Sequence, residues 1–425
     1  MTEDTLQRPG DVNIERLQLI STRNLAVDLD DYLVEFNLYE DMFSQGLSGS
    51  ILISDHRNLV STMPIVGEEL LVVKFTTPTF PTSIEKTFRI TSVTDKQIVS
   101  GQTAHRYILH FISHELSLDM NAPLFKSFDG VIHDVVAEIF TDYVSLDAPL
   151  KILAETKNKV KFVSPGWSAF KCINWLASKS IPAEGKACNF LFWESNKSFY
   201  FTNLETLFQT KRYTGVYTYA PNNVRINNDR DIAREMFLTE SVEIVTSIDH
   251  VKNYTNGYLS NRLIELDLMN KKYEFIDYDH TEKYSEYTHM SDSAMPFFAT
   301  STLRNPLSNV RFYPKHNKLF NDFEENINEV YKDIHGNRLS NMLELDNFKL
   351  NLVVPGRTDV EVGQMIYLLY PNISPRDQSD KVKDNLDPMY TGAYLITGIR
   401  HQITGIKHKM IMEVTKDCLS GNIDI

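Results

Sequence analysis

Val66-Gly-Glu-Glu-Leu-Leu-Val-Val73 and Val362-Gly-Gln-Met-Ile-Tyr-Leu-Leu369 are two occurrences of one pattern, far apart in the chain. Each places a Val-Gly turn before a run of apolar residues, which is typical of a chain that turns into a strand. A second matching pair follows, Phe88-Arg-Ile-Thr-Ser-Val93 in the first case and Tyr394-Leu-Ile-Thr-Gly-Ile399 in the other. The shared order predicts an internal repeat, two copies of one antiparallel β-barrel domain.

Alternating strands flank these stretches in both copies. Leu47–Ile53 and Phe348–Val354 come before them, and Tyr107–Phe111 and Lys409–Thr415 come after them. A period of two is that of a strand with one buried face. The spacings differ, 88 − 66 = 22 residues against 394 − 362 = 32, but the second interval contains the polar loop 371–388, where insertions are tolerated. Chance similarity stays open, because Val-Gly before a strand is a common pattern.

The apolar period changes between the two β regions. After Ser127, which we expect to cap a helix, apolar residues recur at helical spacing from Val131 to Tyr143. A second helix follows Ser168, and residues 190–201 read as a hairpin. We therefore predict a mainly β protein with α+β parts: residues 1–116 as a first tube-like antiparallel β-barrel, 117–215 as a small α+β domain, 216–260 with 347–425 as a second tube-like barrel, and 261–346 as an inserted domain with a helix around Phe323 to Ile334.

Composition excludes several classes of protein. The chain of 425 residues has 43 Lys and Arg against 56 Asp and Glu, a net charge of −13, so it lacks the basic surplus of a general nucleic-acid binder. Its three cysteines, Cys172, Cys188 and Cys418, form no zinc or disulfide pattern, which fits a reducing cytoplasm. No signal peptide and no membrane-spanning segment is expected.

A search for catalytic motifs gives no candidate. Phosphate-binding, zinc-protease, nucleophile-elbow and EF-hand signatures are missing. His105 and His110 would face opposite sides of a strand, so metal binding there with His114 is not expected. Glu68-Glu69 is interpreted as solvated surface charge, because no apolar surroundings would raise a pKa. We predict no enzyme activity, no cofactor and no metal.

One aromatic-rich segment, residues 273–298, stands out within the expected insertion. Exposed Tyr and Phe are typical of surfaces that dock another protein. Stacking on bases or sugars is the second interpretation.

Three groups of residues follow one another in a recognisable order. They are Leu33–Tyr39 with Leu47–Asp55, Trp167–Ser178 with Phe190–Phe201, and Val354–Val360 and Val362-Gly363 with Gly392–His401. In this order they resemble the central baseplate hub proteins of contractile-tailed, T-even-like bacteriophages, which are related to late control D proteins and to the N-terminal part of VgrG proteins. Residues 261–346 match no motif of that family.

The resemblance implies a structural virion protein of the tail baseplate, made late in infection in the host cytoplasm. It implies a homotrimer whose six barrels form a pseudo-six-fold ring, which joins the tail tube, or a tube-initiator protein, to a central spike beside the baseplate wedge proteins. Phage DNA would pass through the lumen without specific binding, and the net negative charge suggests an acidic lumen. A receptor-binding tail protein and, less favoured, a peptidoglycan hydrolase are the alternatives.

Three glycines are the positions singled out as structural turns. Gly67 and Gly363 begin the matched strands, where a bulkier residue would hinder the turn. Gly356 follows Pro355 and is expected to turn the chain into the loop 357–359.

Overall fold

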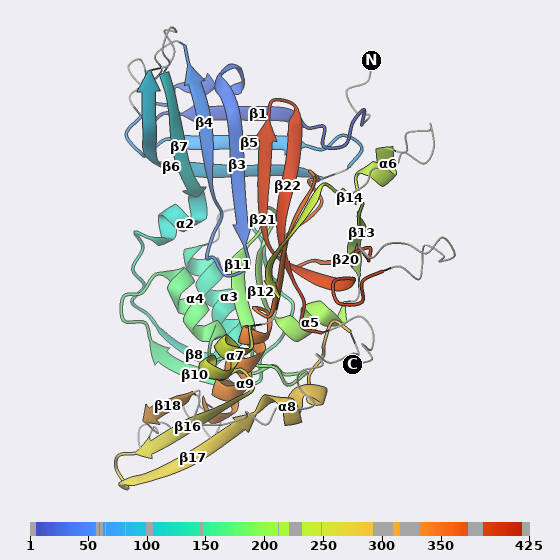
Figure 1. Ribbon diagram of the computed structural model, residues 1–425. Coiled ribbons are helices and arrows are strands. Elements are labelled where there is room, and N and C mark those ends of the chain that lie inside the picture. The colour runs from blue at the N-terminus through green and yellow to red at the C-terminus, as the bar shows by residue number, and fades with distance from the viewer. Residues whose placement is uncertain are drawn as a thin grey trace, which may run out of the picture.

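The computed structural model describes residues 6–56, 59, 63, 65–80, 82–98, 105–144, 148–210, 212–220, 232–247, 249–291, 309–314, 331–372 and 386–418. Most of these residues belong to two barrels in the upper half of Figure 1, with smaller α+β parts below them. Phe323 and Ile327, expected on a helix, lie outside the described residues, and α9 (Tyr331–Glu344) begins after them. Within the part of the chain that the structure describes, no helix is long and apolar enough to cross a membrane.

The first barrel is built from antiparallel neighbours whose alternate side chains fill one core. Phe36, Phe75, Phe88 and Phe111 are at most 2% exposed and pack ring against ring. Such alternation buries one face of every strand. In order across the sheet the strands are β3 (Leu33–Asp41), β4 (Ser48–Asp55), β7 (His105–Ser113), β6 (Ser83–Ile98), β5 (Leu70–Thr76), β1 (Asn13–Ile20) and β2 (Ala26–Asp28), with the short helix η1 (Asp30–Tyr32) before β3.

The second barrel repeats this arrangement and closes on itself. Its antiparallel strands are, in order, β15 (Ser241–Ser247), β19 (Phe348–Pro355), β22 (Lys407–Thr415), β21 (Gly392–Thr404) and β20 (Met365–Leu369). Next to β20 lies the parallel strand β13 (Tyr213–Tyr219), which also pairs with the short strand β14 (Leu238–Thr239). Along the chain, the helix α6 (Ile232–Glu235) precedes β14, and β14 leads directly into β15. A core of Leu, Ile, Val, Met and aromatic side chains fills it.

One long hairpin belongs to both barrels. The base of β21–β22 lies in the second barrel, while its tip inserts beside β3 of the first, where Ile403 is 1% exposed in the core. On the other side of the tip, His408 donates its backbone N–H to the carbonyl of Gly10. The hairpin therefore fixes the two barrels to each other (Figure 1).

A small α+β part lies below the first barrel. Its elements are α2 (His114–Asp119), β8 (Ser127–Val131), α3 (Ile132–Tyr143), β9 (Leu150–Ile152), β10 (Lys159–Val163), α4 (Ala169–Ala177), β11 (Phe190–Glu194), β12 (Phe199–Asn203) and α5 (Leu204–Gln209). The predicted cap at Ser168 is confirmed, because its hydroxyl accepts from the Lys171 N–H. The predicted cap at Ser127 is wrong: Ser127 begins β8 opposite Val163, and α3 starts only after Val131, because pairing with β10 keeps this stretch extended.

A further part is inserted between β15 and β19. It comprises α7 (His250–Asn256), β16 (Ser260–Asp267), β17 (Lys272–Asp279), α8 (His280–Lys283), η2 (Tyr284–Glu286), β18 (Val310–Pro314) and α9. The strands form a sheet in the order β17, β16, β18 at the bottom of Figure 1, with α9 against one face. The predicted fold class, mainly β with α+β parts, is confirmed.

Candidate functional site: the open edges of a shared sheet

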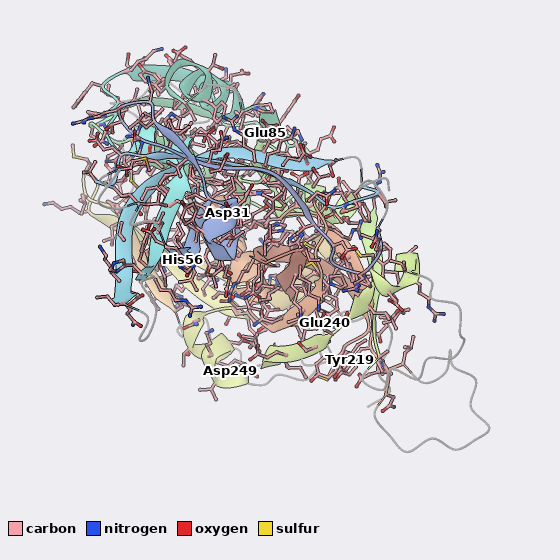
Figure 2. All side chains as sticks on the ribbon, turned by 90° about the horizontal axis from the view of Figure 1, so that it is seen from above. Asp31, His56, Glu85, Tyr219, Glu240 and Asp249 are labelled. Atoms are coloured by element: carbon pink, nitrogen blue, oxygen red, sulfur yellow. The ribbon has the colours of Figure 1, made fainter. Side chains whose placement is uncertain are left out.

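Eight strands of the two barrels form one continuous antiparallel sheet, and its two ends are the candidate site. The order is β15, β19, β22, β21, β3, β4, β7 and β6, crossing between barrels where β21 pairs with β3. The outermost strands, β15 and β6, lie apart in the molecule, as the labelled Glu240 just before β15 and Glu85 in β6 show (Figure 2).

Each end strand has an edge with no strand beside it among the described residues. β5 pairs with β6 only as far as Arg89, whereas β7 pairs with β6 as far as Ile98, which is 73% exposed. β15 pairs with β19 alone, and Val245 in it is 49% exposed. Unpaired backbone N–H and C=O groups next to exposed apolar side chains form a template for a further strand.

The internal repeat shows what kind of strand fits such an edge. The strands β3, β4, β5, β6 and β7 correspond to β15, β19, β20, β21 and β22, because the same neighbours pair in both barrels. Both copies bulge at the same place, between Ile90 and Ser92 in β6 and between Ile396 and Gly398 in β21. In β21 the edge that β6 leaves open is covered by β3.

The matching residues at the two edges differ sharply in burial. Ile98 opposite His105 in the first barrel corresponds to Ile403 opposite His408 in the second. Ile98 is 73% exposed, whereas Ile403 is 1% exposed because β3 and the first core surround it. The open end of β6 is therefore a surface whose counterpart inside the chain is fully buried.

The joint between the barrels contains a buried chain of three titratable groups. Glu40 Oε1 lies 3.1 Å from His401 Nε2, and His401 Nδ1 lies 3.0 Å from His408 Nε2. None of the three is more than 2% exposed, and Phe75 packs edge-on against the His408 ring. Burial, followed by the neighbouring His401, lowers the pKa of His408 well below its usual value. The His408 imidazole in this joint is therefore kept neutral, and His401 links it to the Glu40 side chain.

A buried ion pair fixes the first barrel to the hairpin β11–β12. Lys86 Nζ lies 3.0 Å from Glu194 Oε1, with side chains 8% and 0% exposed, and Glu194 Oε2 accepts from the Leu47 N–H at 3.1 Å. Burial raises the pKa of Glu194, and Lys86 opposes that shift. The pair places β6 against the small α+β part.

Of the three glycines chosen from sequence, Gly67 and Gly363 lie just before the matched strands β5 and β20, and Gly356 follows the end of β19. Gly67 and Gly363 have φ of +95° and +89°, in the left-handed region that disfavours other residues. A Cβ on Gly363 would come within 2.7 Å of Trp193, and one on Gly356 within 2.0 Å of the His408 ring. All three therefore lie at strand ends of the barrels, and Gly356 lies directly at their joint.

The structure shows where Glu69 and the three histidines considered as possible metal ligands lie. Glu69 is fully buried, not solvated, because its carboxylate accepts the N–H groups of Val66 and Gly67 in the turn before β5. The histidines at 105, 110 and 114 are not brought together as a ligand set; His110 lies 3.0 Å from Thr94 Oγ1.

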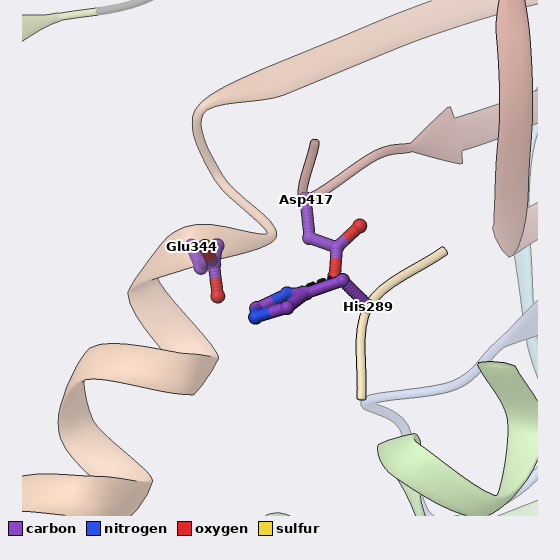
Figure 3. A group of neighbouring side chains, drawn as sticks. All are labelled: His289, Glu344 and Asp417. Carbon is purple, nitrogen blue, oxygen red and sulfur yellow. Dashed lines mark hydrogen bonds and ion pairs between the residues drawn. The ribbon is translucent and has the colours of Figure 1, made fainter. Parts of the chain in front are cut away.

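Within the described residues, one group has metal-ligand character: His289, Glu344 and Asp417, whose ligand atoms lie within 4.8 Å of one another (Figure 3). His289 Nδ1 lies 2.9 Å from Asp417 Oδ2, and Nε2 lies 2.8 Å from the Tyr284 carbonyl oxygen. Both ring nitrogens therefore face acceptors, as in an imidazolium. Burial lowers the pKa of His289, but the bond to Asp417 outweighs it and the pKa rises to about 9. The ion pair between His289 and Asp417 joins the insertion to the segment that follows β22.

Sequence reasoning did not find the open edges. A signal existed: Gln97-Ile98 repeats Gln402-Ile403, and the structure places both pairs at the same position of the repeat. It was hidden because β6 has one extra residue there, shown by the second register shift between Thr94 and Gln97. The quoted repeat also slips by one residue, since Leu70 corresponds to Met365 rather than to Ile366.

Comparison with solved structures identifies the class of fold. The chain superposes on a tail protein of Neisseria meningitidis MC58 with a TM-score of 0.55 and 11% identity, covering 95% of this chain and 96% of that one. A 43 kDa tail protein of prophage MuSo2 from Shewanella oneidensis gives the same TM-score with 7% identity over 95% and 99% of the two chains. The chain has the fold of these tail proteins.

At the level of sequence the similarity is more specific. The chain is 19% identical over 422 residues to a probable baseplate hub protein, gp334, of Vibrio phage KVP40, covering 95% of this chain and 93% of the relative. No protein-family model matches the chain. The predicted resemblance to baseplate hub proteins of contractile-tailed phages is confirmed.

Proposed function

We propose that the chain is a structural baseplate hub that assembles as a homotrimeric ring. The observation that carries the proposal is the pair of open edges at the two ends of the eight-stranded sheet. Within one chain, the equivalent edges are already joined, β21 to β3. Joining β6 of one subunit to β15 of the next repeats that contact and leaves no edge open in a closed ring.

The proposed contact between subunits takes its register from the repeat. Gln402 lies opposite Asn37, and Ile403 opposite Phe36, within the chain. Through β4 and β19, Asn37 corresponds to Glu243 and Phe36 to Val242. In the ring, Gln97 therefore lies opposite Glu243 of the next subunit, and Ile98 lies opposite its Val242. Three subunits with eight strands each form one wall of 3 × 8 = 24 strands.

Such a ring adapts one symmetry to another. Six similar barrels meet a six-fold tail tube, or its initiator protein, in nearly equivalent ways. The insertion occurs only between β15 and β19, whereas β3 and β4 are joined by the short turn 42–47. The ring therefore has three insertions, which suit a three-fold central spike. Baseplate wedge proteins would surround it.

The face of the sheet turned away from both cores suits the wall of a DNA channel, but it is not acidic. Where the eight strands pair with one another, its charged residues are Glu35, Asp41, Glu243 and Glu413 together with Arg89, Arg106, Lys349, Arg400, Lys407 and Lys409. Some pair with each other, as Arg400 does with Glu35 at 3.2 Å. A wall of mixed charge gives DNA few uncompensated cations to bind. The hypothesis of an acidic lumen does not apply to this face.

Cysteine cross-linking tests the ring. Gln97→Cys and Glu243→Cys in one chain should give disulfide-linked dimers and trimers under oxidation on a non-reducing gel, because cross-strand neighbours lie within bridging distance. The three native cysteines are buried and add little background. The matched control, Asn37→Cys with Gln402→Cys, should form a bridge within one chain. Bridging in the control without any inter-chain product from the Gln97–Glu243 pair would overturn the proposed ring.

A receptor-binding role is the second candidate, because Tyr273 and Phe275 in the insertion are 66% and 54% exposed. Purified chain that blocks adsorption of the phage to its host would favour that role. Infection unaffected by an excess of the chain favours the hub.

A further inference from the structure

The sheet of the insertion has one face covered by protein and one face open. α9 packs on the first face, where Gly336 lies against Tyr278 and Asn261 contacts Ser340. On the opposite face, Phe275 of β17, Ile264 of β16 and Phe312 of β18 form one row across the three strands. Tyr273 and Leu266 lie side by side in the next row. Among the described residues no element packs on this open face.

The middle of the open face is apolar and carries no net charge. From the row of Leu266 and Tyr273 to the row of Arg262 and Asp277, its charges belong to Arg262 and Asp277, which bond through two contacts of 2.5 and 2.7 Å. The Arg262 guanidinium lies 5.1 Å from the Phe275 ring centre, and the Phe275 and Tyr273 rings are 5.2 Å apart. On a chain of net charge −13 this neutral aromatic face is an exception. The open face therefore fits a partner with an uncharged apolar surface rather than a partner with a basic surface.

The exposed area is large enough to bind a protein. Tyr273, Phe275 and Phe312 are 66%, 54% and 67% exposed, and Leu268 and Met269 at the adjoining turn are 71% and 65% exposed. With about 200 Å² for each aromatic side chain, the three rings alone offer roughly 400 Å². Three copies in a ring offer about 1,200 Å², above the ~800 Å² per partner of a stable interface.

We infer that this face is a docking surface for a three-fold-symmetric protein with an uncharged apolar surface. The inference rests on the proposed hub, in which that partner is the central spike. Only one of the two equivalent barrels has the insertion, so a ring presents the face three times. A six-fold tube would engage the three faces with only three of its six subunits, whereas a trimeric partner on the same axis engages one face with each of its subunits.

The experiment compares two double variants of the full chain for binding to the purified trimeric spike protein of the same phage. Phe275→Ser with Phe312→Ser removes two rings of the face. Phe125→Ser with Val163→Ser removes two apolar side chains that are 77% and 70% exposed elsewhere. Light scattering gives the mass of each variant, circular dichroism checks its folding, and titration gives its affinity for the spike.

We expect the first variant to keep the mass of the wild-type ring but to bind the spike roughly 30-fold more weakly or not at all, as for loss of two central aromatic contacts. The second variant should bind like wild type. Equal binding by both variants would overturn the inference and leave the hub intact. If wild-type rings associate with one another, and the first variant abolishes that association but still binds the spike, the face would belong to a contact between two copies. That outcome would also overturn the inference. A wild-type ring that binds no spike would defeat the spike-joining role, and the inference with it.

Discussion

Replacing Lys86 by Met should weaken the attachment of the first barrel to the small α+β part. The change removes the cation 3.0 Å from Glu194 and leaves that fully buried carboxylate with hydrogen bonds from the Leu47 N–H and the Ser113 side chain. Breaking one half of a buried ion pair costs about 3–5 kcal/mol. Because Met keeps the length and apolar stem of Lys, the loss reports on charge rather than on packing.

The pH dependence identifies the cause. Burial holds the pKa of Glu194 above its usual value, and removing Lys86 raises it further, because the charge of Lys86 is the largest of the effects that lower it. A carboxyl with a raised folded-state pKa binds more protons in the folded state, so stability falls as pH rises above about 4.5. Lys86→Met should therefore lose less stability at pH 5 than at pH 8.

Urea unfolding followed by tryptophan fluorescence, near Trp193 beside Glu194, measures the effect. The double variant Lys86→Met with Glu194→Gln should recover much of the loss, since Gln can still accept from the Leu47 N–H. An exposed ion pair contributes up to about 1 kcal/mol. If Lys86→Met lowers the free energy of unfolding by less than that at every pH, the pair does not behave as a buried, tightly coupled one, and the reasoning is refuted.

Two further perturbations follow from the structure. Gly356→Ala places a Cβ 2.0 Å from the His408 ring and should cost about 1–3 kcal/mol in unfolding free energy. Gly130→Ala is the control, because its Cβ would meet only an ordinary contact at 3.6 Å. Equal losses in the two variants would count against close packing of Gly356 on His408. The raised pKa of His289, about 9, adds up to about 3 kcal/mol of stability, which is complete below pH 6.5 and is lost as pH rises through 9. In melting temperatures measured across this pH range, His289→Gln should reduce the loss at alkaline pH. An unchanged pH dependence would show that the bond to Asp417 contributes little.

Local periodicity was sufficient to predict most of the barrels. The alternating runs around Phe36, Leu109, Leu350 and Met412 are all strands, because each buries one face in a core that the pattern already describes. Ser127 was misread because helical spacing begins at Val131, and only pairing with β10, distant in sequence, extends the chain before it. Pairing between distant segments leaves little local trace.

The candidate site was less accessible from sequence. The hairpin shared by the barrels depends on contacts between β21 and β3, more than 350 residues apart, and its open counterpart at β6 is visible only once both copies are in place. The burial of Glu69 was also not predicted, because its carboxylate is buried by accepting the N–H groups of Val66 and Gly67 in a turn. The local sequence allows this turn but does not require it. The domain ranges 1–116, 117–215, 216–260 with 347–425, and 261–346 remain predictions, as do the structural roles of Gly67, Gly356 and Gly363.

The mass of the purified chain in solution tests the ring most directly. Light scattering at several micromolar concentrations should give 3 × 49.0 = 147 kDa for the trimer. A ring with a central opening in electron micrographs would then be expected. A mass of 49 kDa that persists when the trimeric spike is added would contradict the proposal that the open edges of β6 and β15 close a three-subunit ring.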